Sequence, residues 1–253
     1  MAGTHGYGVF AAAYDRLTFN VGYSALADYL LLLFERHGHS RPGVLLDAAC
    51  GTGSLALALA GRGVEVVGAD VSADMLAIAA QKAAARSVSL RLLHQPLERL
   101  DLYRRVDGAV CTMDSLNHLT GERALYEALR RIALFIEPGG LFIFDVNTRY
   151  KHRRVLANRT FTYELPELYC VWQNRTKGDL TQITLDLFAG EGSGPYTRST
   201  ERFYERCWPK AVLLPLLQRA GLTPLAILGD RKLASPGPCA ERVFYVTRRD
   251  EGN

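Results

Sequence analysis

Short apolar runs alternate with amphipathic stretches through the first 150 residues of the chain. Five runs, at 44–48, 64–70, 89–95, 106–113 and 141–147, have the length and the flanking turn residues of buried strands. Apolar residues at helical spacing fill 24–37, 54–63, 71–85 and 122–136, with Ser24 and Ser72 as expected N-caps. This alternation predicts the α/β class, with a doubly wound, mostly parallel, Rossmann-like sheet.

The pattern changes after Tyr150. Aromatic-rich alternating stretches follow at 159–165, 168–174, 180–188 and 196–208, with turns expected at Gly178 and at 190–194. No helical pattern separates them, so residues 151–208 are predicted to form an antiparallel β cap inserted into the α/β domain. Helical spacing returns at 211–221, and strands at 222–230 and 241–249 would add one antiparallel strand to the sheet. The α/β domain then comprises 1–150 and 209–253.

The composition is that of a globular chain and does not demand a polyanionic partner. Of 253 residues, 48% are apolar and 22% are charged, and the net charge is +4. The longest apolar run, 30–34, is too short to cross a bilayer, and the first ten residues lack the pattern of a signal peptide. Five cysteines without C-x-x-C spacing indicate reduced, mostly buried thiols and no zinc site, which favours a cytoplasmic protein.

The first strand leads into a glycine-rich turn that suits a ligand containing a nucleoside. In VLLDAACGTGS, Gly51 and Gly53 have the spacing of dinucleotide-binding turns, where glycine lets a ligand approach the backbone. Asp47 distinguishes two ligands, because its carboxylate would repel the pyrophosphate of NAD but suits the α-ammonium group of S-adenosylmethionine. Asp70 ends the second strand, where an acidic side chain can accept hydrogen bonds from the ribose hydroxyls of either ligand.

The ends of the next strands should line the same crevice, because open parallel sheets bind ligands beyond their carboxyl ends. Met75 is a candidate to pack near an adenine, and the backbone of 95–97 is a candidate for its N6 and N1 edge. After the fourth strand, TMDSLNHL places three polar side chains near the expected position of the transferred group: Asp114, Asn117 and His118.

These motifs together resemble those of the class I S-adenosylmethionine-dependent methyltransferases. The resemblance is carried by LLDAACGTGSLALALA, VVGADVSADMLAIA, LLHQPLERLDL, DGAVCTMDSLNHL and EPGGLFIFDVNT, with weaker matches at 10–23 and 241–249. The chain looks most like the branch with a β-rich cap, which includes small-molecule N- and O-methyltransferases. The resemblance implies a seven-stranded sheet with a reversed last strand, and S-adenosylmethionine as the cofactor.

The resemblance also implies cofactor roles for individual residues. In this branch the N-terminal segment folds over the cofactor, which adds two tyrosines to the set. The expected set is Tyr14, Tyr23, Asp47, Ala49, Cys50, Gly51, Gly53, Asp70, Val71, Met75, Gln95, Pro96, Leu97 and Met113. Three positions depart from the family pattern. Ala49 stands where glycine is usual, Pro96 where an acid is frequent, and Phe203 where related caps often carry a histidine.

Methyl transfer from a sulfonium is an in-line displacement with a neutral leaving group, so alignment and exclusion of water should account for most of the catalysis. A general base is needed only for an acceptor that arrives protonated, and His118 is the candidate. Asn117 and Tyr14 complete the expected catalytic group. The expected substrate contacts are His118, Arg149, Trp172, Phe203 and Tyr204.

The sequence therefore favours a methyltransferase that acts on N or O of a small molecule. An RNA or protein methyltransferase is one alternative, and a non-catalytic nucleoside-binding module or an NAD enzyme is another. DSLN in place of an Asn-Pro-Pro-Tyr-like segment disfavours the exocyclic amines of nucleic-acid bases as acceptors. No metal, nucleic-acid or membrane partner is expected, and the sequence does not define the oligomeric state.

Overall fold

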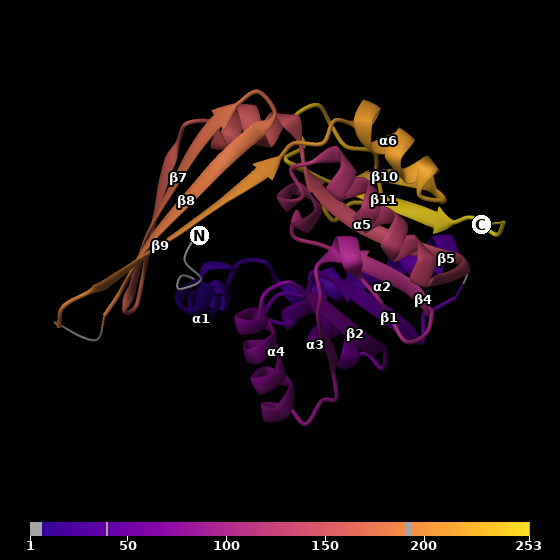
Figure 1. The fold of residues 1–253 in the computed structure, drawn as a ribbon, viewed down its shortest axis with the longest axis horizontal. Helices are drawn as coiled ribbons and strands as arrows, with labels where there is room; N and C mark the ends of the chain where they lie inside the picture. The colour runs from indigo at the N-terminus through magenta and orange to yellow at the C-terminus, as the bar shows by residue number, and fades with distance from the viewer. Residues whose placement is uncertain (1–6, 39, 191–193, 253) are drawn as a thin grey trace.

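The computed structural model describes residues 7–38, 40–190 and 194–252, which form two sheets (Figure 1). The larger sheet has seven strands in the order β10-β11-β5-β4-β1-β2-β3. β1 pairs in parallel with β2 and β4, and β11 runs antiparallel between β5 and β10, which confirms the predicted reversed strand. The strands are β1 (Val44–Ala48), β2 (Glu65–Asp70), β3 (Arg91–His94), β4 (Val106–Cys111), β5 (Ile136–Asn147), β10 (Leu222–Gly229) and β11 (Arg242–Arg249).

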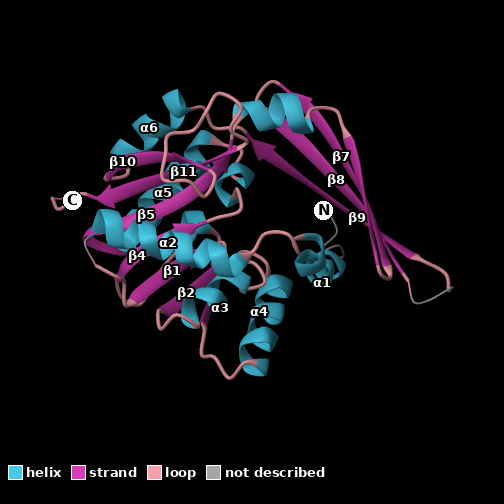
Figure 2. Ribbon diagram, turned by 180° about the vertical axis from the view of Figure 1, so that it is seen from behind, coloured by secondary structure: helices cyan, strands magenta, loops and turns pink. Residues whose placement is uncertain are grey.

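Helices cover both faces of this sheet (Figure 2). α2 (Tyr23–Gly38) and α3 (Ser54–Ala60) pack on one face, and α5 (Glu122–Phe135), α6 (Lys210–Arg219) and the short helix η1 (Leu97–Arg99) pack on the other. Successive side chains of a strand point to opposite faces, so Leu45 and Leu46 of β1 belong to different apolar clusters. α4 (Ala73–Ala85) begins at Ser72, whose hydroxyl accepts the Met75 N–H as the sequence predicts.

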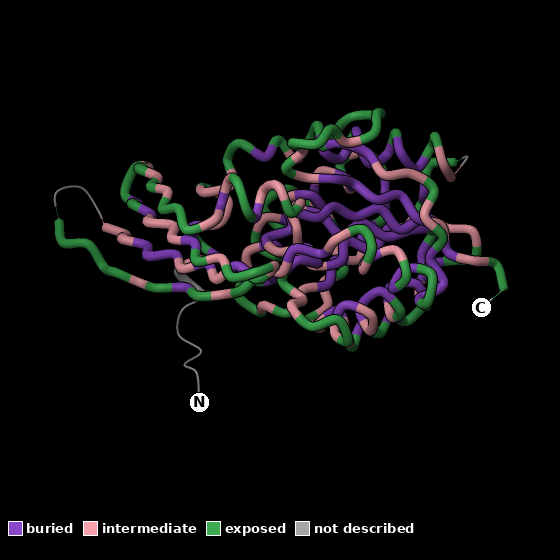
Figure 3. Tube along the Cα trace, turned by 90° about the horizontal axis from the view of Figure 1, so that it is seen from above, coloured by how far each residue is buried: buried purple, intermediate pink, exposed green. Residues whose placement is uncertain are grey.

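The smaller sheet is antiparallel and forms a cap beside the α/β domain (Figure 3). Its strands are β6 (Thr160–Leu165), β7 (Leu168–Lys177), β8 (Leu180–Ala189) and β9 (Thr197–Arg206), in that order. The inner face of the cap buries Cys170, Ile183 and Leu185 in one cluster with Ala13 of α1 (Tyr7–Leu17). Because α1 also contacts α4, it links the cap to the cofactor side of the larger sheet.

The structure departs from the sequence prediction at two places. β5 begins at Ile136, within the helix expected at 122–136, because Ile136 pairs with Val106 of β4. Pro138, Gly139 and Gly140 lie in the register shift between this pair and the pair of Gly108 with Leu141. A helical turn, η3 (Lys151–Leu156), opens the segment 151–208, for which the pattern predicts strands alone. The turn at Gly178 is confirmed, and the one at 190–194 lies largely outside the described residues.

The cysteines and the lengths of the helices give two further findings. All five cysteines are free, and Cys239 is the exposed one. Across the described ranges, no helix combines the length and the apolar character needed to span a membrane.

Gly140 lies where β5 passes close to β4. A Cβ atom there would overlap the carbonyl oxygen of Asp107 and would lie 2.6 Å from Ile136 Cγ2. We expect Gly140→Ala to lower the free energy of unfolding by about 1–3 kcal/mol, the usual cost of overpacking. Urea denaturation measures the change. Gly237→Ala is the control, because no described atom lies within 4 Å of a Cβ at that position, and equal losses in both variants would contradict this account.

Candidate active site

The chain extends the sheet from β1 in two directions, with β2 and β3 on one side and β4 and β5 on the other. The chain leaves β1 into α3 on one face and reaches α5 on the other face after β4. This divergence opens a crevice at the carboxyl edge of the sheet. Asp47 lies near the end of β1, Asp70 ends β2, and His118 lies beyond the end of β4. These three strands are adjacent, so the fold brings the main candidates from the sequence to one edge of the sheet.

The turn after β1 has the backbone of a close-approach loop. Ala49, Gly51 and Gly53 have φ values of 60°, 54° and 72°. No described atom lies within 4 Å of a Cβ built on Gly51, whereas a Cβ on Gly53 would lie 2.9 Å from Ala79 Cβ. Gly51 therefore leaves room for a ligand, and Gly53 lets α4 pack closely. Ala49 adopts the left-handed conformation at a cost of roughly 1–2 kcal/mol, which a glycine would avoid.

Asp47 is buried at the carboxyl end of β1, with 2% of its surface exposed. Its Oδ2 atom is buried and finds no hydrogen-bond partner among the described residues. Burial, reinforced by the charge of Asp70, raises the pKa of Asp47 to about 7. A buried carboxylate oxygen without a partner is unfavourable. The residues at this turn therefore fit a ligand that brings a cationic donor, such as the α-ammonium of S-adenosylmethionine.

Asp70 holds the same turn from the end of β2. Its two oxygens accept the N–H groups of Gly51, at 2.8 Å, and Ser72, at 2.9 Å. The N–H of Val71 also bonds to this carboxylate. A carboxylate has about four acceptor sites, so capacity remains for a ribose hydroxyl. Val71 beside it is 64% exposed. The Gln95 N–H donates to the Asp70 carbonyl at 2.9 Å, so an adenine contact at 95–97 falls to the other backbone groups.

Helix α1 is fastened to the glycine turn through Asp15. This carboxylate accepts hydrogen bonds from Thr52 Oγ1 at 2.6 Å, Ser54 Oγ at 3.1 Å and Lys82 Nζ of α4 at 2.6 Å. The anchored helix carries Tyr14, whose hydroxyl shares a hydrogen bond with Tyr23. Burial, with the charges of Tyr23 and Asp114, raises the pKa of Tyr14 well above its usual value, so it stays a neutral phenol.

Arg242 of β11 fixes the turn after β4. Its guanidinium lies 2.6 Å from Asp114 Oδ1 and 3.1 Å from Asp145 Oδ1. Asp145 is fully buried and accepts the N–H groups of Met113 and Asp114, at 2.9 and 2.8 Å, which hold these residues at φ values of 58° and 53°. Burial acts to raise the pKa of Asp114, but the charge of Arg242 outweighs it and the pKa is lowered. The short helix η2 (Ser115–His118) starts from this fixed turn.

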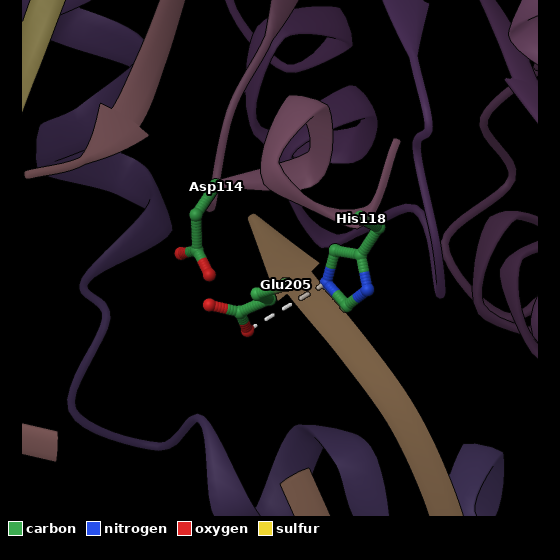
Figure 4. A group of neighbouring side chains, drawn as sticks. All are labelled: Asp114, His118 and Glu205. Atoms are coloured by element: carbon green, nitrogen blue, oxygen red, sulfur yellow. Dashed lines mark ion pairs between the residues drawn. The ribbon is translucent and has the colours of Figure 1, made fainter. Parts of the chain in front are cut away.

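Asp114, His118 and Glu205 converge beyond this turn, with Glu205 contributed by β9 of the cap (Figure 4). A nitrogen or oxygen atom of each lies within 4.8 Å of the others, and His118 Nε2 is 4.0 Å from Glu205 Oε1. Glu205 is buried, while the His118 side chain is 45% exposed. Burial, aided by the charge of Asp114, raises the pKa of Glu205 to about 8, and desolvation lowers the pKa of His118. A group that titrates near neutral pH thus lies beside a neutral imidazole.

Two of the expected site residues serve the scaffold. Asn117 is fully buried; its amide nitrogen donates to the carbonyl of Arg206 at 2.8 Å, and its Oδ1 accepts the Asn147 N–H at 3.0 Å. It therefore ties η2 to both β9 and β5. Arg149 forms an ion pair with Asp179 at 3.0 Å, instead of turning toward His118.

The cap aromatics divide between its two faces. The Phe203 ring lies 5.1 Å from the His118 ring and 6.4 Å from Phe10, on the inner face. Tyr204 is the next residue along β9, so it points to the outer face, where it is 45% exposed and accepts a hydrogen bond from Gln182. Tyr204 and Phe203 were both expected to contact the substrate, and β9 places their side chains on opposite faces of the cap sheet. Trp172 is on the inner face and donates to Asn174 at 2.8 Å, within the apolar cluster of the cap.

Sequence reasoning missed Glu205, Arg242 and Asp15. Arg242 and Asp15 act on partners far along the chain, and no local pattern marks such pairs. The position of Glu205 was predictable from the sequence, because the alternation that places Phe203 on the inner face of β9 places Glu205 there as well.

Known proteins include relatives of this chain. The model of a methyltransferase domain family matches residues 45–140. A putative methyltransferase of Geobacillus sp. (strain WCH70) is 30% identical over 245 residues, 96% of this chain and 99% of that protein. The dTDP-3-amino-3,6-dideoxy-alpha-D-glucopyranose N,N-dimethyltransferase of Streptomyces fradiae is 35% identical over 140 residues, 54% of this chain and 53% of its own.

Solved structures give the same result. An S-adenosylmethionine-dependent methyltransferase from Clostridium acetobutylicum ATCC 824 matches with a TM-score of 0.88 at 27% identity, over 96% of this chain and 99% of that one. The sugar N-methyltransferase KedS8 from Streptoalloteichus sp ATCC 53650 shares the fold, with a TM-score of 0.78 at 19% identity, over 99% and 96%. The chain belongs to the class I S-adenosylmethionine-dependent methyltransferase family, and S-adenosylmethionine is its cofactor.

Removing the cation of Arg242 should destabilise the fold. Arg242→Met leaves Asp114 and Asp145 without their shared partner, so we expect the free energy of unfolding to fall by about 3–5 kcal/mol. Urea denaturation at pH 7 measures the loss. Arg105→Met is the matched control, because Arg105 forms an exposed pair with Glu137 at 4.0 Å and should matter by less than about 1 kcal/mol. Similar losses in both variants would show that the buried triad does not stabilise the fold.

Asp47 should make the ligand-free protein less stable as the pH rises. Its pKa of about 7 lies above the ordinary 3.8, so between these values the unfolded chain releases a proton that the folded chain keeps. Stability is therefore lost from about pH 4 to pH 7 and not regained above. We expect Asp47→Asn to exceed the parent by roughly 1–4 kcal/mol at pH 8 and to match it near pH 4.

Urea denaturation at the two pH values makes this comparison. Asp74→Asn, at an exposed position on α4, is the control and should show no such difference. An Asp47→Asn protein that is less stable than the parent at pH 8 would mean that the ionised carboxylate is already stabilised in the ligand-free fold.

Proposed function

We propose that this methyltransferase holds S-adenosylmethionine along the carboxyl edge of β1, β2 and β4 and methylates N or O of a small molecule enclosed by the cap. The observation that carries the proposal is the buried, unpartnered Oδ2 of Asp47 beside the open backbone at Gly51. In this assignment Asp47 receives the α-ammonium group and Asp70 receives the ribose hydroxyls. The other assigned contacts are Tyr14, Tyr23, Ala49, Cys50, Gly53, Val71, Met75, the backbone of Gln95, Pro96 and Leu97, and Met113.

The bound cofactor supplies a methyl group on a sulfonium, whose sulfur departs as a neutral thioether. The tasks left to the chain are alignment, exclusion of water and control of a proton. α1 and the inner face of the cap meet through Phe10 and Phe203, whose ring centroids are 6.4 Å apart, and this contact would shield the transfer site. His118 would face the acceptor, because it is the half-exposed member of its cluster.

The placement of positive charge supports a small acceptor. Arg175, Arg198 and Arg202 line a polar groove on the outer face of the cap sheet. Phe203 and Glu205 occupy the inner face of the same sheet, so a polyanion in the groove would be separated from His118 by the sheet itself. The Streptomyces fradiae relative is named for an amino sugar nucleotide, an acceptor of the small-molecule class.

The two sheets would divide the work. Residues 1–150 and 209–253 would bind the cofactor, and residues 151–208 would select the acceptor. This division is supported by the position of the Asp47 and Asp70 contacts, which lie wholly within the α/β domain.

Calorimetric titration tests the cofactor assignment. S-adenosylmethionine and S-adenosylhomocysteine should bind, and NAD should bind far more weakly. Asp70→Ala removes charge-assisted hydrogen bonds worth roughly 1.5–3 kcal/mol each, so its affinity should fall at least about tenfold. Asp74→Asn is the control and should bind as the parent does. Unchanged affinity in Asp70→Ala, or preference for NAD, would refute the assignment.

A transfer assay tests the acceptor class. Methyl-labelled S-adenosylmethionine is incubated with a panel of primary amines, matched alcohols, bulk tRNA and a basic peptide. Labelling of panel members from the first two groups is expected. Labelling of tRNA or of the peptide alone would refute a small-molecule acceptor.

A further inference from the structure

We infer that Glu205 is a catalytic residue that takes the proton from an acceptor bound as an ammonium ion, which makes the acceptor a small amine. This inference rests on the proposed function and deepens it, because it names both the proton acceptor and the acceptor class. It comes from the cluster of Asp114, His118 and Glu205, and from a buried histidine behind that cluster.

The cluster is built to receive a cation. Asp114 and Glu205 bring two carboxyl groups from opposite sides, one from the turn after β4 and one from the cap, and they point toward each other in Figure 4. The ring of Phe203 lies 5.1 Å from the His118 ring and gives the position an apolar neighbour. A protonated amine at this point would be attracted by both carboxyl groups, whereas an alcohol would gain only hydrogen bonds.

His152 supplies an independent observation. It is fully buried on η3, and its Nδ1 lies 2.9 Å from Thr181 Oγ1. Its Nε2 has no hydrogen-bond partner among the described residues and faces Glu205 Oε2 at 3.8 Å. Thr181 and Glu205 are paired across β8 and β9, so the sheet itself sets this arrangement.

The unpartnered nitrogen of His152 is what a protonated Glu205 would need. Burial lowers the pKa of His152 to about 4, so the imidazole is neutral and can accept a hydrogen bond through Nε2. A proton on Glu205 Oε2 would then satisfy both groups after a small approach. Asn147 holds Glu205 Oε2 at 3.3 Å and accepts a hydrogen bond from Lys151 at 2.9 Å, which keeps the carboxyl group in place.

The proton transfer balances without a further reactant. The carboxylate of Glu205 takes one proton from the ammonium group, leaving a neutral amine and a carboxylic acid. The amine lone pair forms the new N–C bond as the C–S bond breaks, and the electron pair of that bond stays on sulfur. The methylated nitrogen again carries a positive charge, and the proton on Glu205 returns to solvent past the half-exposed His118.

A divalent metal ion is the competing occupant of the same cluster. Asp114 already has a cation, since Arg242 lies 2.6 Å from its Oδ1. The pair with Arg242 weakens a metal site, because a metal ion would need Asp114 as a ligand. Proton exchange with an amine needs only one carboxyl group that titrates near neutral pH, and burial raises the pKa of Glu205 to about 8.

The first experiment observes Glu205 directly. Carbon-13 NMR of glutamate carboxyl groups, assigned with Glu205→Gln, follows its titration in the full chain with S-adenosylhomocysteine present. The titration should occur at least about 2 pH units above that of exposed glutamates. Methylammonium chloride should lower this midpoint and methanol should not, because only the cation favours the carboxylate. His152→Phe should also lower the midpoint by removing the partner of the protonated form.

The charged or titratable groups that face Glu205 all contribute to its pKa. They come from the turn after β4 and η2, from η3 and from β11: Asp114, His118, Lys151, His152 and Arg242. Each remains in place in the parent titration, so the effect of methylammonium is read against a constant background.

The second experiment uses amines that the transfer assay labels. Glu205→Gln should reduce kcat for these amines about 100-fold at pH 7, and the deficit should shrink as the pH approaches the pKa of the amine itself. Glu201→Gln is the matched control, because Glu201 is also a buried glutamate on the inner face of β9. Its kcat should stay within about threefold of the parent. Both variants should retain their affinity for S-adenosylhomocysteine.

Several outcomes would overturn the inference. They are an ordinary titration of Glu205, no response to methylammonium, equal kcat in the two glutamine variants, and labelling of alcohols alone. Binding of magnesium or zinc chloride that is lost in Glu205→Gln, with activity abolished by EDTA, would assign the cluster to a metal. Failure of the proposed function is seen separately, as absence of S-adenosylmethionine binding in calorimetry.

Discussion

The arrangement of the active-site edge depends on one guanidinium that serves two carboxylates, the fully buried Asp145 and the mostly buried Asp114. Arg242 lies against Asp114 and Asp145, and Asp145 in turn holds two backbone N–H groups of the turn after β4. Two carboxylates this close are tolerated in a buried place only with a shared cation. Because β11 runs antiparallel beside β5, Arg242 is opposite Asn147 at the carboxyl end of β5 and reaches the turn from there. The reversed strand β11 therefore fixes the turn after β4 through Arg242. His118 lies on the short helix that begins at this turn, so its position depends on β11 as well.

The α/β architecture was predictable because local patterns encode it. Apolar runs flanked by turn residues gave the strands of the larger sheet, and Ser72 marked the start of α4. The cofactor edge was predictable for the same reason, since Asp47, Gly51 and Asp70 follow directly from strand ends. The start of β5 at Ile136 was not, because it depends on a pair with Val106 of the distant β4, and Pro138–Gly140 lie in the register shift that follows this pair. The alternation of side chains along β9 places Tyr204 on the outer face and Glu205 on the inner face. That alternation was not applied to these two residues, so Tyr204 was expected at the substrate and Glu205 was overlooked. Arg242 and Asp15 depend on partners far away along the chain, which no single stretch reveals.

The site contains groups that are unfavourable in the ligand-free fold. Asp47 and Glu205 both have raised pKa values because they are buried without full compensation, and Ala49 is strained. Each feature lowers the stability of the ligand-free fold. Each also lies at the proposed cofactor or acceptor site, where a bound ligand would contact it. The large apolar clusters on both faces of the seven-stranded sheet offset these costs. Such a distribution is typical of enzymes, whose polar sites are held in position by rigid surroundings.

The cap is joined to the α/β domain at the catalytic cluster itself. Asn147 bonds to Glu205 at 3.3 Å, and Asn117 bonds to the Arg206 carbonyl at 2.8 Å, so the cross-ties lie at the root of β9. The root is therefore the end of β9 that is fixed by hydrogen bonds to the α/β domain. β9 has ten residues, and at about 3.3 Å per residue it forms a lever about 33 Å long. A rotation of about 10° would move its far tip by about 6 Å but a carboxyl group about 4 Å from the axis by less than about 1 Å. A tilt of β9 about its root would thus almost preserve the spacing of His118 and Glu205, and it would separate the inner face of the cap from Ala13 of α1.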